Sequence, residues 1–405
     1  MPPILQKWLK VALVNLCIVA LIGVILRYKI VFALPFVDQK HLLHGHSHFA
    51  FAGWITQVLM ILLVTYLYRH GLTNSFKKYA WLLIGNLLTA YGMLITFPLE
   101  GYGIFSITFS TLSIFVSYFF AVIFWKDLNN IQGHANAHLW FKAAVFFNAI
   151  SSLGAFSLAF MMAQHVVHQN WYLSSVYFFL HFQYNGWFFF GCMGLLMSKL
   201  EDMQIVQPSI QSVYWIFLSA CIPAYFLSAP WIPLPFNLSA VYVLAALAQV
   251  VAWLFFLTII FKNLALLKEN VSPVGKLLLS LSAIALTIKL LLQVGSTYPP
   301  LGQLAFGFRP IVIGYLHLVL LGVITIFLIG YIVNNRFIIL TKKTFIGILI
   351  FTCGIIINEI LLMIQGISGL NYETVPHTNE MLLGTAIIMF TGLVVTLIPQ
   401  FKKQK

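Results

Sequence analysis

The chain has 405 residues, of which 61% are hydrophobic and only 8% are charged, and its formal net charge is +13. Soluble domains carry roughly a quarter charged residues, so this composition excludes a water-soluble protein and predicts one that lies in a lipid bilayer. The 22 Lys and Arg residues are dispersed between apolar stretches instead of forming one basic face, which excludes nucleic acid as a partner.

Continuous apolar stretches recur along the whole chain. A helix crosses a hydrocarbon core about 30 Å thick in ~20 residues, whereas the strands of a membrane barrel are ~10-residue segments of alternating polarity. The continuous stretches therefore predict an all-α, polytopic membrane helix bundle with about 12 transmembrane helices. We expect one transmembrane domain, 1–405, without a repeated motif, and spans near residues 8–27, 44–67, 79–97, 104–125, 139–163, 171–198, 211–230, 238–262, 275–294, 309–333, 344–365 and 381–399.

The basic residues indicate how these spans are oriented. With the N-terminus inside, most of the 22 Lys and Arg residues fall on the inner side, and the outer side holds Arg27, Lys29, Lys40 and Arg309. Because Lys and Arg are enriched in cytoplasmic loops, both termini are expected in the cytoplasm. The expected location is a bacterial inner membrane.

Three of the expected spans carry histidines among apolar and aromatic residues. The string HLLHGHSHFAFAGW begins at His41, FFLHFQYNGWFFFG surrounds His181, and GYLHLVLLG surrounds His317. The three spans run in the same direction, so depths can be compared at about 1.5 Å per residue. His48, His181 and His317 are all expected in the outer half of the membrane.

Neutral imidazole is the commonest metal ligand and the usual axial ligand of haem. The alternative is that each histidine merely bonds a backbone carbonyl or a neighbouring helix. For His181 and His317, the cost of an unpaired polar group in lipid favours a specific partner. On a helix, His44 and His48 share a face while His46 points about 160° away from it, so these three cannot bind one ion. His44, His46 and His181 are the candidate ligands of copper or non-haem iron.

Histidines on the second, sixth and tenth of about twelve spans resemble the haem-copper oxidase superfamily, which contains subunit I of cytochrome oxidases and the nitric oxide reductases. The string HFQYNGWFFFG is similar to the reductase pattern HLWVEGxWE in His181, Gly186 and Trp187. The resemblance implies a haem b held between His48 and His317, and a non-haem metal at His181. The family has a His-His pair on its seventh span and two histidines on its tenth, whereas 211–230 has no histidine and 309–333 has one.

A second resemblance is to NnrS-type membrane proteins, which bind haem and copper and are associated with nitric oxide metabolism. His46, His48 and Gly53 match their HxHxxxxG pattern on an early span, and His317 followed by Gly322 loosely resembles a later one. This ligand set is nearer to NnrS than to a complete oxidase. No CxxCH is present, so a covalent c-type haem is excluded.

Ionisable residues inside a membrane are costly and usually functional. Lys289 and Glu359 are the two that stand out, both in the outer half, where they could form a buried ion pair or take part in proton transfer. Arg309 lies two turns before His317, where it could bind a haem propionate or a lipid headgroup. The inner halves of the spans contain no column of Asp, Glu or Lys, so proton pumping is not expected.

Three functions remain open at this point. In the enzyme hypothesis, a non-pumping membrane oxidoreductase takes electrons from an electron-donor protein and reduces nitric oxide or oxygen near His181, at a site lined by Tyr184 and Asn185. In the binding hypothesis, the same residues hold haem or copper, and the protein senses, buffers or protects against a small gaseous ligand without turnover. The missing histidines favour the binding hypothesis. The third hypothesis, a metal transporter, lacks most of the broken helices expected near the midplane.

Overall fold

The computed structural model describes residues 3–205, 209–232, 235–370, 373 and 375–401. Over these ranges the secondary structure is helical, without a strand. The elements in chain order are α1 (Pro3–Val31), α2 (Gln39–Phe49), η1 (Ala50–Thr56), α3 (Gln57–Arg69), α4 (Ser75–Glu100), α5 (Ile104–Leu128), α6 (Ala135–Ala163), α7 (Gln169–His181), η2 (Phe182–Phe188), α8 (Phe189–Asp202), α9 (Ser209–Cys221), η3 (Pro223–Ser228), α10 (Phe236–Lys262), α11 (Leu264–Asn270), α12 (Pro273–Gly295), α13 (Pro299–Gly307), α14 (Arg309–His317), η4 (Leu318–Thr325), α15 (Ile326–Asn334), α16 (Lys342–Leu370), α17 (Thr378–Leu397) and η5 (Ile398–Phe401).

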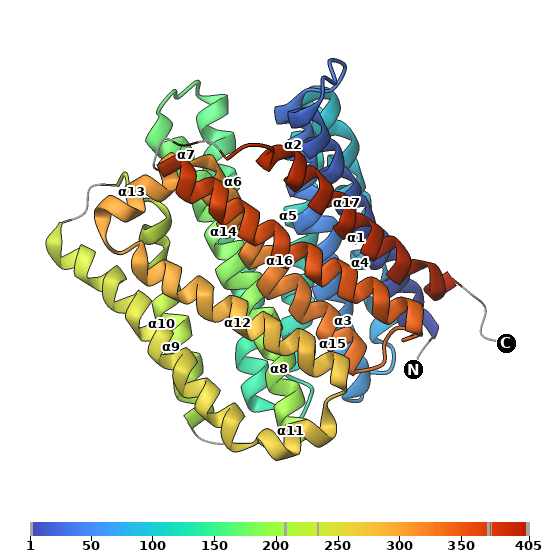
Figure 1. The fold of residues 1–405 in the computed structure, drawn as a ribbon. Helices are drawn as coiled ribbons and strands as arrows, with labels where there is room; N and C mark the ends of the chain where they lie inside the picture. The colour runs from blue at the N-terminus through green and yellow to red at the C-terminus, as the bar shows by residue number, and fades with distance from the viewer. Residues whose placement is uncertain (1–2, 206–208, 233–234, 371–372, 374, 402–405) are drawn as a thin grey trace. The chain divides into compact units, whose positions relative to one another are not determined.

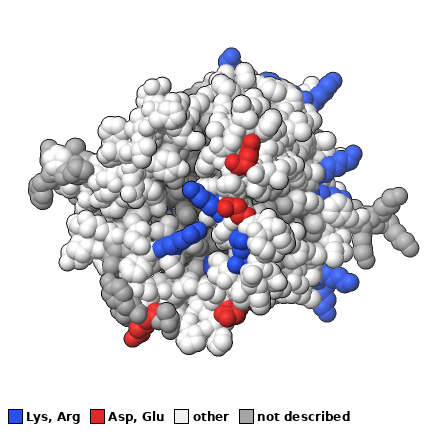
Figure 2. Space-filling model, turned by 90° about the horizontal axis from the view of Figure 1, so that it is seen from above, with Lys and Arg blue, Asp and Glu red and all other residues white. Residues whose placement is uncertain are grey.

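Ten helical runs in the described residues are long and apolar enough to cross a membrane. The chain is therefore an integral membrane protein, and the all-α helix bundle predicted from the sequence is confirmed. Figure 2 shows one face of the molecule, on which charged side chains are few and most of the surface is uncharged. The runs are Pro3–Val31, Gln39–Arg69, Ser75–Glu100, Ile104–Leu128, Ala135–Ala163, Ser239–Lys262, Pro273–Gly295, Arg309–Asn334, Lys342–Leu370 and Thr378–Phe401.

Two of the twelve expected spans differ from these ten runs. The expected span 171–198 is one continuous run of α7, η2 and α8, but Gln183 and Asn185 lie in its middle and make it more polar. The expected span 211–230 is shorter, because α9 ends at Cys221 and a 3₁₀ helix begins at Pro223. Proline lacks a backbone N–H and clashes with the preceding turn of an α-helix, which favours the end of α9 before Pro223.

The residues cluster into two compact units. Unit 1 comprises Met1–Ile123, Pro273–Leu279 and Thr325–Lys405, and unit 2 comprises Phe124–Ser272 and Ser280–Ile324. Within unit 1, α16 packs along α17, α17 packs along α1, and α2 packs against α4 (Figure 1). Within unit 2, α6 packs against α7 and α8, and α9 packs against α10. Whether the units fold and function as a single domain stays a prediction.

The helical run Gln39–Arg69 is the most buried of the ten, with 89% of its most apolar stretch covered. Its α2 and α3 segments both pack against α4, and η1 packs against α1. This run also carries the densest group of histidines in the sequence, from His41 to His48. The fold of unit 1 therefore surrounds the segment that the sequence marks as a candidate metal or haem site.

Candidate functional site

On each of the three histidine-bearing spans, a π-helix begins within two residues after one candidate histidine. His48 lies two residues before η1, while His181 and His317 are the last residues of α7 and α14 and are followed directly by η2 and η4. In the described residues these are the three π-helical segments. A π-helix bonds i to i+5, is rare, and occurs frequently at functional sites. The structure thus marks the same three histidines that the sequence singled out.

A glycine lies five residues after each of these histidines, at Gly53, Gly186 and Gly322. A Cβ on Gly186 would lie 2.5 Å from Cβ of Phe147 on α6, and one on Gly53 would lie 2.6 Å from the ring of Phe49. Both approaches are closer than side-chain atoms tolerate. The pattern His-x₄-Gly therefore occurs three times, each time beside a π-helix, while the expected absence of an internal repeat stays a prediction.

Side chains from neighbouring helices bond to carbonyls of the π-helices. Asn15 on α1 donates to the carbonyl of Gly53 at 2.5 Å, and Ser282 on α12 donates to that of Val323 at 2.7 Å. The thiol of Cys221 lies 3.8 Å from the carbonyl oxygen of Asn185. Irregular backbone is tolerated at membrane depth only where protein groups satisfy it. These polar side chains therefore support the three π-helices.

In unit 1, His44 and His48 face α4. The ring of His48 stacks on Phe97 with centroids 4.3 Å apart and planes at 14°, and the ring of His44 meets Tyr102 edge-on at 4.7 Å. His46 faces the other way, toward α1, where its Cε1 would lie 3.6 Å from a Cβ on Gly23. The expected separation of the two faces is confirmed, so His46 cannot share an ion with the other two.

Two imidazole nitrogens of this group are buried without a hydrogen-bond partner among the described residues, namely Nε2 of His44 and Nδ1 of His46. A buried polar atom without a partner costs free energy, and natural structures contain few of them. A bound metal, cofactor or water at these nitrogens would remove the cost. Both nitrogens therefore fit the ligand role that the sequence predicts for His44 and His46.

In unit 2, His181 is 1% exposed and both of its ring nitrogens are bonded. Nε2 lies 2.8 Å from the carbonyl oxygen of Cys221, so Nε2 carries the hydrogen. Nδ1 then accepts from the side-chain amide of Asn185 at 3.1 Å. A metal on His181 would have to replace one of these partners, and its assignment as a ligand stays a prediction.

The other predicted residues of this region lie close to His181. The ring of Tyr184 is buried, with its centroid 6.3 Å from that of His181 and 6.3 Å from that of Tyr315 on α14. The hydroxyl of Tyr184 shares a hydrogen bond with Ser228 in η3. The structure thus brings together three of the predicted site residues, His181, Tyr184 and Asn185, around η2.

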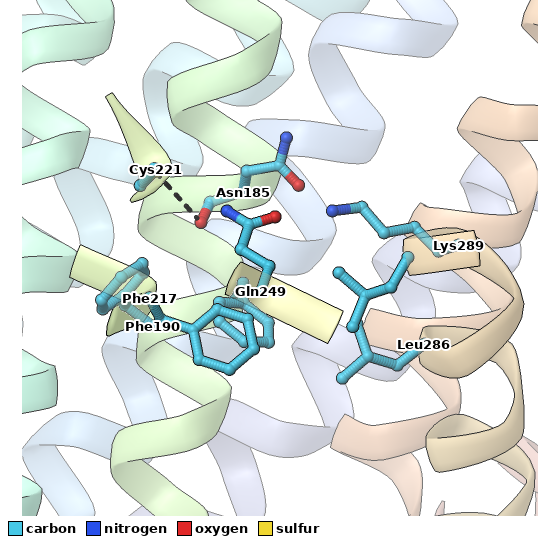
Figure 3. A pocket seen from close by; sticks show the side chains of 9 residues that line it. Asn185, Phe190, Phe217, Cys221, Gln249, Leu286 and Lys289 are labelled. Carbon is cyan, nitrogen blue, oxygen red and sulfur yellow. Dashed lines mark hydrogen bonds between the residues drawn. The ribbon is translucent and has the colours of Figure 1, made fainter. Parts of the chain in front are cut away.

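A small cavity in unit 2 adjoins this group. Its walls include Asn185, Cys221, Gln249 and Lys289, and Figure 3 shows the polar ends of Asn185, Gln249 and Lys289 turned toward one another. The ammonium of Lys289 donates to Oε1 of Gln293 at 2.6 Å, and Nε2 of Gln293 donates to Oε1 of Gln249 at 2.9 Å. Sequence reasoning found Lys289 and Asn185 but missed both glutamines, although Gln293 lies one turn after Lys289 on the same helix.

The remaining predicted residues lie apart within their own units. Glu359 on α16 in unit 1 accepts a hydrogen bond from the amide of Asn358 at 3.1 Å, whereas Lys289 belongs to unit 2, so their ion pair stays a prediction. Arg309 is exposed at the start of α14, and His317 is half-buried at its end. The pairing of His48 with His317 as haem ligands likewise joins the two units and stays a prediction.

Comparisons of the sequence with protein families and with curated proteins find no match for this chain. Unit 1 offers two imidazoles with an unpartnered buried nitrogen among the described residues, and unit 2 contains a small polar cavity beside a buried amine. Groups of this kind can bind a metal, a haem or a small ligand.

Proposed function

We propose that this chain is a haem- or copper-binding membrane protein of the haem-copper oxidase type, with a reduced set of histidine ligands and a role in nitric oxide or oxygen chemistry. The observation that carries the proposal is the π-helix that follows His48, His181 and His317. A π-helix costs regular hydrogen bonds and persists where function needs it. Three of them beside the three candidate histidines are hard to attribute to packing alone.

The surroundings of the histidines in unit 1 suit a haem edge or a copper ion. His48 lies flat on Phe97, and His44 has a buried Nε2 without a partner in the described structure. His48 and His317 would be the haem ligands, with Arg309 at a propionate, and His44 would be the best placed ligand for copper. When bound, a haem supplies one-electron transfer, and copper or non-haem iron supplies an open position for a diatomic ligand.

Binding without turnover is favoured over complete reductase activity. The chain lacks the histidine pair that the reductases carry on their seventh span, and α9 contains no histidine. His181 bonds to Cys221 and Asn185 through its two ring nitrogens, so a metal at His181 would have to replace one of these partners. The proposal therefore is a sensor, buffer or protective binder of nitric oxide or oxygen in a bacterial inner membrane, and an electron-donor protein is needed only if turnover occurs.

The proposal is tested by an optical spectrum and a metal analysis of protein purified from cells with an adequate haem supply. His48→Ala and His317→Ala should each abolish a low-spin haem spectrum, because each removes one of two axial ligands. His181→Ala should retain that spectrum and lose bound copper, bound iron or reactivity with nitric oxide. His377→Ala is the matched control, since this histidine is 82% exposed, and it should change neither property.

Two results would contradict the proposal. One is purified protein that contains neither haem nor a transition metal. The other is a haem spectrum that survives both His48→Ala and His317→Ala. Either result would bring the metal transporter forward as the function to test next.

A further inference from the structure

His41 and His44 lie one turn apart on α2, within unit 1. Residues three positions apart on a helix share a face, and their Cβ atoms lie about 5–6 Å from each other. Two histidines about one turn apart on one helix face can bind a single metal ion, and zinc proteases use a pair of this kind. His48 continues the same face by one more turn, but its imidazole lies flat on Phe97. His41 is therefore the neighbour of His44 that no proposed role yet uses.

Both imidazoles pack against the segment that follows α4. A Cβ added to Gly101 would lie 2.5 Å from Nε2 of His41, and the ring of the next residue, Tyr102, meets the ring of His44 edge-on at 4.7 Å. Gly101 is the C-cap of α4 and has a φ of +63°, a conformation that favours glycine. Because Gly101 and Tyr102 are adjacent in the chain, the fold brings both imidazoles to one short stretch of backbone.

The ring of His44 has a nitrogen suited to a metal ligand. Its Nε2 is buried without a hydrogen-bond partner among the described residues. A buried imidazole nitrogen in this state costs free energy, and a metal ion that accepts its lone pair removes the cost. His41 and His44 are both partly exposed as whole residues. The pair is therefore not sealed inside the unit, and an ion can reach it.

The charges around the pair are compatible with a cation. Asp38, one turn before His41, accepts a hydrogen bond of 2.7 Å from the backbone N–H of His41. Glu100 directly precedes Gly101 and accepts from a backbone amide of α5 at 2.6 Å. Lys40 is the adjacent positive charge, and its side chain is exposed, so its ammonium can extend into water. Two carboxylates with fixed backbone contacts therefore border the pair, while the one adjacent cation lies at the surface.

We propose that His41 and His44 form a two-histidine site for one late first-row transition metal ion, Cu²⁺ or Zn²⁺. Imidazole suits these ions, whereas Mg²⁺ and Ca²⁺ prefer oxygen ligands. Two protein ligands leave coordination positions open for water or for a small ligand. The inference rests on the proposed function in the role of His44 as a metal ligand, and it adds His41 as the second ligand. It is independent of the haem, since neither histidine is a proposed haem ligand.

The test is binding of Zn²⁺ to the purified full-length protein in detergent, after removal of any polyhistidine tag. Titration calorimetry at neutral pH should show saturable binding. His41→Ala and His44→Ala should each lower the affinity by at least about tenfold, because each removes one of two protein ligands. His377→Ala, an exposed histidine of the same unit, is the matched control and should bind as the unmodified protein does. With Cu²⁺ as the probe, the electron paramagnetic resonance spectrum should show two coupled nitrogens and lose one of them in His41→Ala.

Gly101→Ala tests the geometry without removing a ligand, and it keeps the test decisive if His44→Ala does not fold. The added Cβ takes the place of the His41 ring, so the imidazole must turn aside, and the Zn²⁺ affinity should fall as in His41→Ala. Gly71→Ala is its control, because Gly71 also has a positive φ but a Cβ there meets nothing within 4 Å. This control should leave Zn²⁺ binding unchanged.

Three results would overturn the inference. They are unmodified protein without saturable Zn²⁺ binding, unchanged binding in His41→Ala or in Gly101→Ala, and binding that is lost in His48→Ala but not in His41→Ala. The last result would assign His48 as the partner of His44. The haem spectrum gives a separate answer, because protein that contains no haem but binds Zn²⁺ through His41 and His44 would contradict the haem assignment and leave this site standing.

Discussion

Asp38 begins the helix that carries His41, His44, His46 and His48. Its side chain accepts a hydrogen bond of 2.7 Å from the backbone N–H of His41, which makes it the N-cap of α2. This hydrogen bond holds the pKa of the Asp38 carboxyl below its ordinary value of 3.8, because the bond favours the ionised form. The stability of the first turn of α2 therefore depends on the charge of one exposed carboxylate.

Protonation of Asp38 should loosen the start of α2. A carboxyl with a lowered pKa in the folded state stabilises that state above pH 3.8, and the effect is lost as the pH falls through the lowered pKa. We expect faster hydrogen exchange of the His41 amide below that pH, and at all pH values in Asp38→Ala. Asp38→Asn, which caps without a charge, should remove the pH dependence while the amide stays protected. Equal protection in Asp38→Ala and the unmodified protein would contradict this role.

For single residues, the directions of side chains on one helix can be predicted from the sequence. Contacts between side chains of different helices cannot. The opposite directions of His46 and the His44–His48 face follow from helix geometry alone. The bond between His181 and the carbonyl of Cys221 joins residues 40 positions apart, and that carbonyl is available because the helix ends before Pro223. The proline, and with it the end of the helix, can be read from the sequence. Which side chain bonds to the free carbonyl at that helix end cannot.

The length of an apolar stretch predicts a single helix. It does not distinguish a π-helical segment from the α-helix on either side of it. The five-residue spacing of His181 and Gly186 matches the i to i+5 bonding of η2, but helix prediction searches for a period of 3.6. The close contact of Gly186 with Phe147 of α6 involves a residue on another span. A tertiary contact, and not a local preference, therefore decides the residue type at this position.

Gly186→Ala tests the tertiary role of that glycine. Because the added Cβ would lie 2.5 Å from Cβ of Phe147, the two helices must separate, and we expect a loss of about 1–3 kcal/mol of unfolding free energy. Gly384→Ala on α17 is the control, since a Cβ there meets nothing within 4 Å. It should be neutral or stabilising by up to ~1 kcal/mol. Denaturant titrations of both variants in the same detergent provide the comparison, and equal stability would refute the contact.

For the whole molecule, composition and charge distribution predict the class of protein and its orientation. The integral membrane class is confirmed by the ten apolar helical runs. The grouping into two units could not be predicted, because each unit gathers segments that are distant in sequence. Residues 273–279 and 325–405 join residues 1–123 in unit 1, while the chain between them belongs to unit 2.

The orientation is tested by a reporter fused after Lys405. Basic residues are concentrated on the expected inner side, so a cytoplasmic reporter should be active and a periplasmic one inactive. A fusion after Arg27 or Lys29 on the expected outer side should give the opposite pattern. An outside C-terminus would place the three candidate histidines in the inner half of the membrane.

The π-helices also determine where the chain can change length. Each accommodates an additional residue within its span, so a single-residue deletion between Phe182 and Phe188 would return the segment to an α-helix. The side chains on either side of the segment would then keep their directions, whereas the same deletion in a regular α-helix turns every later side chain by about 100° around the helix axis. In related sequences, single-residue deletions within the histidine spans should therefore fall in the three π-helices and not in the α-helices beside them.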